Sequence, residues 1–578
     1  MQRRIPYSVV NFERLRQGMY YYVDKTGYIR QLEKYACPVF LRPRRFGKSL
    51  WCSILECYYD ISRKGVFERL FGGTEIGARP TPSHNSCLVL KLNFSTVKPG
   101  IGISDLEDSF NRTVSNAADE FIRHYEGYFG AGDELRAQPN ATEFLKKLVS
   151  QVKSEGLPRL YVIIDEYDNF TNQLLASMRD ADYRTLTTAD SFLRTFFKTL
   201  KAGTEDGAIR TVFMTGVLPV TLDDLTSGFN IGQNLSLRPE MLSMIGFTRT
   251  EVERYVDDVL FDYGFDLSLR PRILSDMRAY YDGYRFSGEA DEPLYNPTIC
   301  SSYLSELIDN GGRLPRRTID TNVKPDIAWL TVMARRGTAV ENLLQSLVGR
   351  NEPVPISPEK VNEQISAGKF FSAEYFPLCL YYLGLLTFKD EFSLGVPNLS
   401  VERVVLDYYQ EVHVRKDPVL SDPKVVEALR AFVANRRWKD LFGTFWEYGI
   451  RRIMPAKLFS YVNEFFFQVM FFGFCIDRLS SRYSIRIEEN HFSGQSDFLA
   501  VPVPGEDAPI VVLEFKYISK GAAKKAVVPA GDSAQVVHAK DQLSRYMQDV
   551  RLQHPGKSVE GAVVLVTGNS GFEFFDVL

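Results

Sequence analysis

The chain has 578 residues, too many for a single hydrophobic core, so we expect two to four domains. Apolar residues make up 45% and charged residues 24%, which is an ordinary soluble globular composition. The formal net charge of −3 gives no general attraction to nucleic acid, so any polyanion site must be a local basic patch.

Cysteine usage and hydropathy indicate the compartment. The 7 cysteines include no Cys-x-x-Cys pair, which argues against a disulfide framework and against zinc and fits a reducing compartment. The chain opens on polar and basic residues, with no secretory signal. The most apolar stretch, Phe465 to Ile476, is about half the ~20 residues of a membrane helix, and we interpret it as a buried core helix. We therefore expect a cytoplasmic protein, or a nuclear one in a eukaryote, with no membrane contact.

The first half of the chain alternates strand-like and helix-like segments, which predicts a parallel α/β sheet. The expected strands are 39–41, 87–94, 160–164 and 211–214, with a helix over 49–59 after the first of them. The run 160–164 is wholly apolar, which is typical of a strand buried on both faces.

The second half changes character twice. The pattern is helical from about 247 to about 344, and 370–409 predicts a small helix-plus-hairpin unit. Past residue 438 a long helical stretch leads into strands at 483–488, 497–503 and 510–517, a helix over 539–550 and a strand at 561–566. The domains we expect are therefore 1–250, 251–345, 346–420 and 421–578.

Residues 41–49, Leu-Arg-Pro-Arg-Arg-Phe-Gly-Lys-Ser, follow a predicted strand and open a predicted helix, which is the setting of a phosphate-binding loop (P-loop). Backbone N–H groups there form an anion site, and Gly47 allows close approach. Lys48 would reach the β- and γ-phosphates, and the Ser49 hydroxyl would hold Mg²⁺. Arg42 stands where the P-loop pattern has its first glycine, so on this segment alone a basic surface turn is an equal alternative.

A second element favours the nucleotide site. The apolar strand that starts at Leu160 ends in Asp165 and Glu166. We expect this strand to lie beside the P-loop strand, with Asp165 at Mg²⁺ and Glu166 polarising the attacking water. Strands often end in charges by chance, but both elements occur in the order that an ATP site requires.

These motifs resemble the AAA-ATPase-like family that is often fused to a C-terminal PD-(D/E)XK nuclease domain. The matching segments, over about residues 5–300, are 22–26, 42–50, 165–168, 215–217, 227–231, 246–248, 281–286 and 295–297. An arginine in place of the first glycine is usual in this family. The resemblance implies ATP and Mg²⁺ as cofactors and nucleotide contacts from Arg44, Arg45, Phe46, Gly47, Lys48, Ser49, Leu50 and Asp165.

The resemblance also implies a sensor-like role for Thr215, at the end of the strand 211–214. A strand-end threonine with a purely structural hydrogen bond is an equal alternative. No arginine finger can be assigned from the sequence.

A second group of polar residues lies near the C-terminus. Asp497 begins a predicted strand, and Glu514 and Lys516 close another, where alternation places both on one face. Asp497 and Glu514 would hold Mg²⁺, and Lys516 would orient or deprotonate the attacking water, or stabilise developing charge. In isolation, an exposed Glu-x-Lys ion pair is the simpler explanation.

The C-terminal arrangement resembles the PD-(D/E)XK nuclease core, over about residues 455–578. The resemblance implies catalytic roles for Glu464 on the preceding helix and Gln542 on the following one. Gln495 departs from the arginine that relatives usually carry, whereas the metal ligands are intact.

Together these observations predict an α/β multidomain protein. It combines a P-loop NTPase parallel sheet, a helical and winged-helix-like middle, and a restriction-endonuclease-like α/β domain. We expect an ATP-regulated, Mg²⁺-dependent nuclease acting on nucleic acid, with DNA inferred by family analogy. Two alternatives stay open: a nucleotide-dependent switch with a non-cutting nuclease remnant, and an ATPase motor or remodeller that works as a homo-oligomer.

Overall fold

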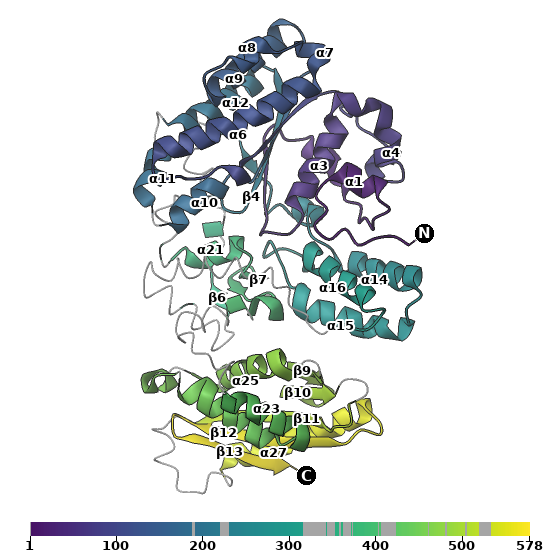
Figure 1. Cartoon of the computed structure of the whole chain (residues 1–578), viewed down its shortest axis with the longest axis vertical. Coiled ribbons are helices and arrows are strands. Elements are labelled where there is room, and N and C mark those ends of the chain that lie inside the picture. Colours follow the sequence, from purple (N-terminus) through teal and green to yellow (C-terminus); the bar gives the residue numbers. More distant parts are fainter. Residues whose placement is uncertain are drawn as a thin grey trace. The chain divides into compact units, whose positions relative to one another are not determined.

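Figure 1 shows the computed structural model of the chain. It describes residues 2–315 apart from 178, 188–190 and 220–229, residue 343, and residues 353–577 apart from 358–359, 362–371, 373, 403, 406–422, 453, 461, 480–481, 503–505 and 519–532. The chain forms two compact units, residues 1–340 with 353–401 and residues 341–352 with 402–578. The domain boundaries expected at 345 and 420 lie outside the described residues.

The first unit is built on a parallel sheet in the order β2-β3-β4-β1-β5. Its strands are β1 (Pro38–Leu41), β2 (Leu88–Asn93), β3 (Leu160–Asp165), β4 (Ile209–Gly216) and the short β5 (Gln233–Asn234). The first four confirm the expected strands. Every residue of β3 is buried, as its apolar run predicts.

The expectation that the acidic strand lies beside the P-loop strand is wrong. β4 lies between them and pairs with β1 on one side and β3 on the other. Thr215 of β4 is in register with both Phe40 and Asp165. The order along the chain does not set the order in the sheet, because helical crossovers allow a later strand to insert between two earlier ones.

Helices cover both faces of this sheet, as a buried parallel sheet requires. α3 (Lys48–Tyr59) follows β1 and packs on β2 and β3, with α1 (Phe12–Gln17) against it. α6 (Ile103–His124), α9 (Ala141–Ser154) and α12 (Phe192–Glu205) pack on β2, β4 and one another. Figure 1 shows these two groups on opposite sides of the sheet.

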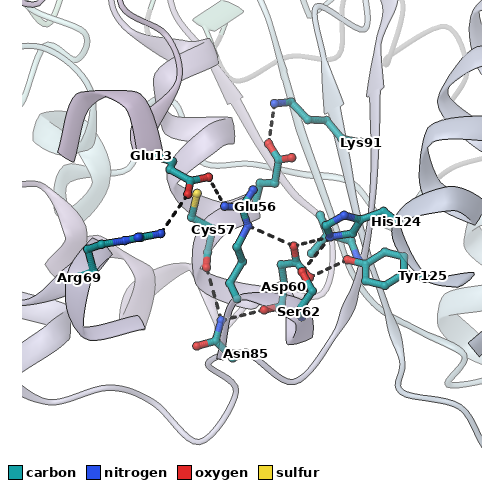
Figure 2. Close-up of polar contacts among 12 residues, drawn as sticks. Glu13, Glu56, Cys57, Asp60, Ser62, Arg69, Asn85, Lys91, His124 and Tyr125 are labelled. Atoms are coloured by element: carbon teal, nitrogen blue, oxygen red, sulfur yellow. Dashed lines mark hydrogen bonds and ion pairs between the residues drawn. The ribbon is translucent and has the colours of Figure 1, made fainter. Parts of the chain in front are cut away.

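A buried polar network holds the carboxyl end of α3 (Figure 2). Asp60 is 3% exposed, and its carboxylate accepts hydrogen bonds from the Tyr125 hydroxyl and the Ser62 N–H, both at 2.9 Å. His124 Nε2 lies 2.9 Å from the same carboxylate. The Tyr125 hydroxyl also accepts the backbone N–H of Val89 at 2.8 Å. The network therefore ties the end of α3 to α6 and β2.

The helical segment expected after residue 247 is confirmed as far as residue 315. It contains α14 (Arg249–Tyr263), α15 (Arg270–Tyr281) and α16 (Pro297–Asp309), which share one apolar core. The part of this prediction between 316 and 342 lies outside the described residues.

The helix-plus-hairpin prediction is also confirmed. α21 (Phe376–Tyr382) leads into the hairpin of β7 (Thr387–Asp390) and β8 (Ser393–Gly395), and β6 (Val354–Pro355) pairs with β8. Gly384, between α21 and β7, has a φ of 80°, and a Cβ there would lie 2.7 Å from Pro43 Cβ. The turn after α21 therefore lies directly against the P-loop, and only glycine allows that approach.

The second unit holds a mixed sheet in the order β13-β12-β11-β10-β9. Its strands are β9 (Tyr483–His491), β10 (Gly494–Pro502), β11 (Ile510–Ile518), β12 (Val559–Thr567) and β13 (Gly571–Val577). Only β11 and β12 pair in parallel. β10 begins at Gly494, three residues before the expected start at Asp497, because the hairpin after β9 resumes pairing at once.

Helices cover both faces of this mixed sheet. α25 (Glu464–Leu479) packs through Phe471 on Phe498 and Phe515, and α27 (Ala534–Gln553) packs on Leu499 and Val512. These strand positions have opposite parity, so the helices lie on opposite faces. The apolar stretch from Phe465 to Ile476 lies within α25 and is a core helix, as expected. Among the described residues, the helices are all too short or too polar to cross a membrane.

Candidate functional site

The loop between β1 and α3 leads from a strand into a helix, which is the setting of a phosphate-binding loop. α3 begins at Lys48, and its N-cap residue Gly47 has a φ of 102°, which glycine adopts without strain. Arg45 also has a left-handed backbone, and its carbonyl accepts a hydrogen bond from Thr298 Oγ1 of α16 at 2.6 Å. In this part of the structure, no side chain caps the first turn of α3, so its N–H groups are open to an anion.

Lys48 is buried beneath this loop, with 7% of its surface exposed. Its ammonium donates hydrogen bonds to the carbonyls of Arg42 at 2.9 Å and Pro43 at 3.0 Å. Burial lowers the pKa of Lys48, and the nearby carboxylates at the end of β3 oppose that shift. The ammonium is thus placed to exchange two carbonyl partners for phosphate oxygens.

The acids at and just after the end of β3 lie near enough to Lys48 to interact with its charge. Burial, and then the charge of Asp165, raise the pKa of Glu166, whose backbone is left-handed with a φ of 54°. Asp168 is buried and accepts the N–H groups of Val217 at 3.0 Å and Leu218 at 2.6 Å. Asp168 therefore fixes the end of β4 against the loop after β3, a role that the motif alone did not reveal.

Asp165 fits the role of a magnesium ligand. It is 2% exposed, and its Oδ1 has no hydrogen-bond partner among the described residues. A buried carboxylate oxygen without a partner is costly, and a hard cation would remove that cost. Ser49, in the first turn of α3, is half-buried and could supply the hydroxyl ligand.

Arg42, which stands at the position of the first P-loop glycine, lies in the interior. It is 1% exposed, and its guanidinium donates to the carbonyls of Ser236 at 2.9 Å and Leu242 at 3.0 Å. The same group lies 4.3 Å and 4.0 Å from the ring centroids of Phe40 and Phe286. Burial lowers the pKa of Arg42 to about 10. Arg42 is an internal clamp that holds the P-loop to two later segments.

The side chains of two predicted nucleotide contacts are engaged elsewhere. Phe46 packs against Tyr284 and Phe286, with ring centroids 4.9 Å and 5.3 Å away, which leaves its backbone N–H for phosphate. The Thr215 hydroxyl donates to the carbonyl of Phe40 at 2.8 Å and so holds β4 to β1. A sensor role for Thr215 would require that bond to open. Arg44 is exposed beside the loop, and Leu50 is half-buried on α3.

In the second unit, the predicted acids and lysine of β10 and β11 form one cluster with Glu464. Lys516 Nζ donates to Glu514 Oε1 and to Glu464 Oε2, both at 3.1 Å. Asp497 Oδ2 accepts the N–H of Phe515 at 2.6 Å, which places Asp497 against β11. Glu464 joins the cluster from the first residue of α25.

The cluster is crowded with negative charge. Burial, and then the charge of Glu514, raise the pKa of Asp497 to about 8. Burial also raises the pKa of Glu514, although Lys516 opposes that shift. Burial disfavours the Lys516 ammonium, but Glu514 and Asp497 outweigh it, and the pKa of Lys516 is raised.

The cluster fits a divalent cation held by two carboxylates. Glu514 Oε2 is buried and has no hydrogen-bond partner in the described part of the chain. The described residues contain no group of three or more His, Cys, Asp or Glu side chains that could hold a metal ion. Lys516 bonds one oxygen of Glu514 and one oxygen of Glu464, so Glu514 Oε2, with Asp497 beside it, is the carboxylate oxygen best placed to hold a cation.

Gln542 is the predicted site residue that is not joined to this cluster. It is half-buried on α27 and makes no hydrogen bond to the four cluster residues as the structure describes them. Its supporting role stays a prediction. Gln495 is exposed, and its backbone N–H donates a hydrogen bond to the Tyr546 hydroxyl. The Tyr546 ring stacks on His491, with ring centroids 5.7 Å apart.

Comparison with protein families assigns both regions. Residues 6–226 match the model of a predicted AAA-ATPase family, and residues 462–574 match the PD-(D/E)XK nuclease superfamily. The chain joins an AAA-ATPase-like domain to a PD-(D/E)XK nuclease-superfamily domain. This confirms the two resemblances. The first match contains the P-loop and the acids of β3, and the second contains the whole cluster of the nuclease-like domain.

Individual relatives are distant. The chain is 29% identical over 304 residues to an uncharacterized protein in the vnfD 5' region of Azotobacter chroococcum mcd 1, and the match covers 51% of each protein. The chain thus spans about half the length of this relative. A Walker-type ATPase of Pyrococcus abyssi is similar at 13% identity and a TM-score of 0.40, over 66% of this chain and 94% of the other.

Sequence reasoning missed several residues that build the P-loop site of the AAA-ATPase-like domain. Phe286 and Tyr284 support Arg42 and Phe46, and Thr298 binds the loop directly. The available signal was their position in or beside the matched motifs 281–286 and 295–297. Their role depends on contacts with residues more than 200 positions away in the chain.

Proposed function

We propose that the protein is an ATP-regulated, Mg²⁺-dependent nuclease that cuts DNA. One shared observation carries the proposal. Each domain places a lysine near a buried carboxylate oxygen that has no partner among the described residues: the buried Lys48 near Asp165, and the half-buried Lys516 beside Glu514. Phosphoryl transfer and phosphodiester hydrolysis both use a positively charged side chain close to an oxygen ligand for Mg²⁺.

In the AAA-ATPase-like domain, Lys48 would leave its two carbonyl partners and bind the β- and γ-phosphates. Ser49 and Asp165 would hold the magnesium ion, which when bound neutralises phosphate charge. Glu166, whose pKa is raised by burial and by Asp165, would orient the attacking water and accept its proton. The bare N–H groups of the first turn of α3 would bind the phosphate oxygens.

In the nuclease-like domain, Asp497 and Glu514 would hold magnesium, which when bound polarises the phosphodiester and acidifies its water. Lys516 would orient the attacking water or stabilise charge on the phosphate. Glu464 bonds Lys516 at 3.1 Å and would act as a positioning residue that keeps the ammonium at the cluster. DNA as the substrate rests on analogy with the superfamily.

Contacts within the first unit support regulation by ATP. Arg42 lies against Phe286, and the Tyr381 hydroxyl of α21 donates to the Phe286 carbonyl at 3.0 Å. Gly384 lies against Pro43 of the P-loop. A change in the loop on ATP binding would therefore be felt at α21 and its hairpin. Regulation then requires that ATP bind two arrangements of this segment with different affinity.

The test uses purified protein with Lys48→Ala and Lys516→Ala, and it measures ATP turnover and Mg²⁺-dependent cleavage of DNA and RNA. We expect Lys48→Ala to lose ATP turnover, and Lys516→Ala to lose cleavage while it keeps ATP turnover. Undiminished cutting by Lys516→Ala would remove the nuclease assignment. Undiminished ATP turnover by Lys48→Ala would remove the ATPase assignment.

A second candidate function is a nucleotide-dependent switch whose nuclease-like domain binds nucleic acid without cutting it. The observation that favours it is that the Lys516 ammonium is bonded to two carboxylates, as in a structural ion pair. Wild-type protein would then bind DNA but leave it intact in both Mg²⁺ and Mn²⁺. Cleavage in either metal, lost in Lys516→Ala, would exclude this candidate.

A further inference from the structure

The turn between β9 and β10 in the second unit presents a phenylalanine to solvent. β9 ends at His491 and β10 begins at Gly494, and these two residues are paired, so the β9–β10 turn consists of Phe492 and Ser493. Phe492 is 99% exposed. Two-residue turns favour glycine, asparagine and aspartate, which fit their backbone angles, and they gain nothing from a large apolar side chain. The requirements of the turn therefore do not account for Phe492.

Contacts with α27 hold the β9–β10 turn in place. Ser493 donates two hydrogen bonds to Asp549 Oδ2, from its N–H at 2.7 Å and from its hydroxyl at 2.5 Å. On the other side of the turn, the His491 ring stacks on the Tyr546 ring. Both chain neighbours of Phe492 are thus fixed to α27, and they hold its ring out into solvent.

The β9–β10 turn is close to the acidic cluster of the nuclease-like domain. Burial, and then the charge of Glu514, raise the pKa of Tyr546, and the charge of Asp497 adds to that shift. Tyr546 thus contacts the turn and lies near the cluster. Phe492 precedes Asp497 by five residues, so their Cα atoms are at most about 18 Å apart. Because a strand of a DNA duplex advances about 3.4 Å per nucleotide, about five nucleotides cover that span.

One ring on a narrow turn suits a flat ligand better than a protein surface. An aromatic side chain offers about 150–250 Å² of contact, whereas a stable protein interface needs about 800 Å² from each partner. A nucleobase has a face of similar size to the ring, and stacking of a base on an aromatic side chain tolerates any sequence. Arg545 is exposed on α27 next to Tyr546, where it could contact a phosphate of the same strand.

We propose that Phe492 stacks on an unpaired base, so that the nuclease-like domain prefers DNA with a single-stranded segment. This inference rests on the proposed nuclease function. In an intact duplex both faces of each base are covered by its neighbours, and insertion of a ring has to unstack them. A single strand, or the branch point of a flap, exposes a base face in advance. The base that stacks on Phe492 would lie within about five nucleotides of the cut.

The experiment measures affinity and the rate of Mg²⁺-dependent cleavage for one DNA sequence as a single strand, as an intact duplex and as a duplex with a single-stranded flap. Affinity is measured in the Lys516→Ala background, which prevents cutting in the proposed mechanism. Phe492→Ala removes the ring, Phe492→Leu keeps an apolar side chain without a ring, and Phe492→Trp keeps an aromatic ring. Phe392→Ala is the matched control, because Phe392 is 63% exposed in the two-residue turn between β7 and β8 of the other unit.

We expect protein with Phe492 to bind and cut the single strand and the flap more readily than the duplex. Phe492→Ala and Phe492→Leu should weaken binding of the single strand about 5- to 100-fold, as expected for the loss of one stacked base. Phe492→Trp should keep the preference, and Phe392→Ala should leave it unchanged. An abasic site at one position within about five nucleotides of the cut should weaken binding to Phe492 protein but not to Phe492→Ala.

Two results would overturn the inference and leave the proposed nuclease function standing. The first is a duplex that is bound and cut as well as the single strand. The second is a Phe492→Leu variant that keeps the preference of the wild type. A changed oligomeric state of Phe492→Ala in sedimentation, with an unchanged preference for DNA, would assign the ring to a protein interface instead. Failure of the protein to bind any of the three forms would overturn the proposed nuclease function, and this inference with it.

Discussion

Arg42 shows how one residue can replace the glycine of a phosphate-binding loop. A glycine at this position would allow a tight turn. The Arg42 guanidinium instead lies buried between two aromatic rings and donates hydrogen bonds to the carbonyls of Ser236 and Leu242. The loop gains rigidity from an interior cation where a glycine would have allowed an unusual backbone angle. Conversion to the more common glycine should therefore weaken the protein.

We expect Arg42→Gly to lower the free energy of unfolding by about 3 kcal/mol, because it leaves buried carbonyls without donors and empties the space between the rings. Arg42→Lys should recover little, since an ammonium cannot reproduce the planar fork. Urea unfolding followed by circular dichroism measures both. Wild-type stability in Arg42→Gly would show that the clamp is dispensable.

Asp497 illustrates a cost that the proposed nuclease cluster imposes on stability. Its pKa is raised to about 8 by burial and by Glu514, so at neutral pH the folded state holds a carboxyl that prefers to be protonated, whereas the unfolded chain ionises it freely. The folded pKa lies above the unfolded one. This contribution therefore favours folding at acid pH and turns against it as the pH rises above about 4.

Asp497→Asn should accordingly raise the melting temperature of the nuclease-like domain at pH 7 by about 2–4 °C for each kcal/mol gained. The Phe515 N–H keeps an acceptor in this variant. Cleavage should be lost, and added Mg²⁺ should raise the melting temperature of wild-type protein only. Calorimetry with and without Mg²⁺ measures the change in melting temperature and its dependence on the metal. A lower melting temperature in Asp497→Asn than in wild-type protein would contradict the idea that the ionised Asp497 destabilises the folded state.

At the scale of elements, α3 is anchored at both ends. Its start carries the P-loop, and its end is held by Asp60 through Tyr125 and β2 (Figure 2). The Asp60 carboxylate accepts a buried hydrogen bond from the Tyr125 hydroxyl and a part-buried one from the Ser62 N–H, which makes it the centre of this anchor. Removal of the Asp60 carboxylate should therefore loosen α3, including its first turn at the phosphate site.

Asp60→Ala should lower the free energy of unfolding by about 1–3 kcal/mol, because it leaves the buried Tyr125 hydroxyl without its acceptor. His124→Ala removes a half-exposed partner of the same carboxylate and should cost less than about 1 kcal/mol. Equilibrium urea unfolding compares the two variants. Equal losses would indicate that the ion pair, and not the buried hydroxyl, anchors the helix.

The elements that carry local signals could be predicted from the sequence. The strands β1 and β3, the helix α3 and the pair Glu514–Lys516 follow from apolar runs, a P-loop spacing and simple alternation. The position of β4 between β1 and β3 could not be predicted, because strand order depends on crossovers. The partners of Arg42 lie about 200 residues away in the chain, so no local pattern reveals that it is a buried clamp.

At the scale of the whole molecule, the two proposed sites lie in different compact units. Units with separate cores can unfold separately, and a ligand stabilises only the unit that binds it. We expect calorimetry to show two transitions, of which Mg-ATP raises one. Lys48→Ala should keep both transitions and lose that shift. A single transition that moves as a whole with ATP would indicate that the units unfold together.

The position of β4 between the other two strands has a consequence for nucleotide discrimination. Phe40, Thr215 and Asp165 stand level on three adjacent strands, so two strand spacings, about 10 Å, separate the backbone before the loop from the acid. A ligand held at both ends must extend across this fixed interval. In the proposed site, a diphosphate bound by the loop would end short of Asp165, so the insertion of β4 between β1 and β3 would favour ATP over ADP.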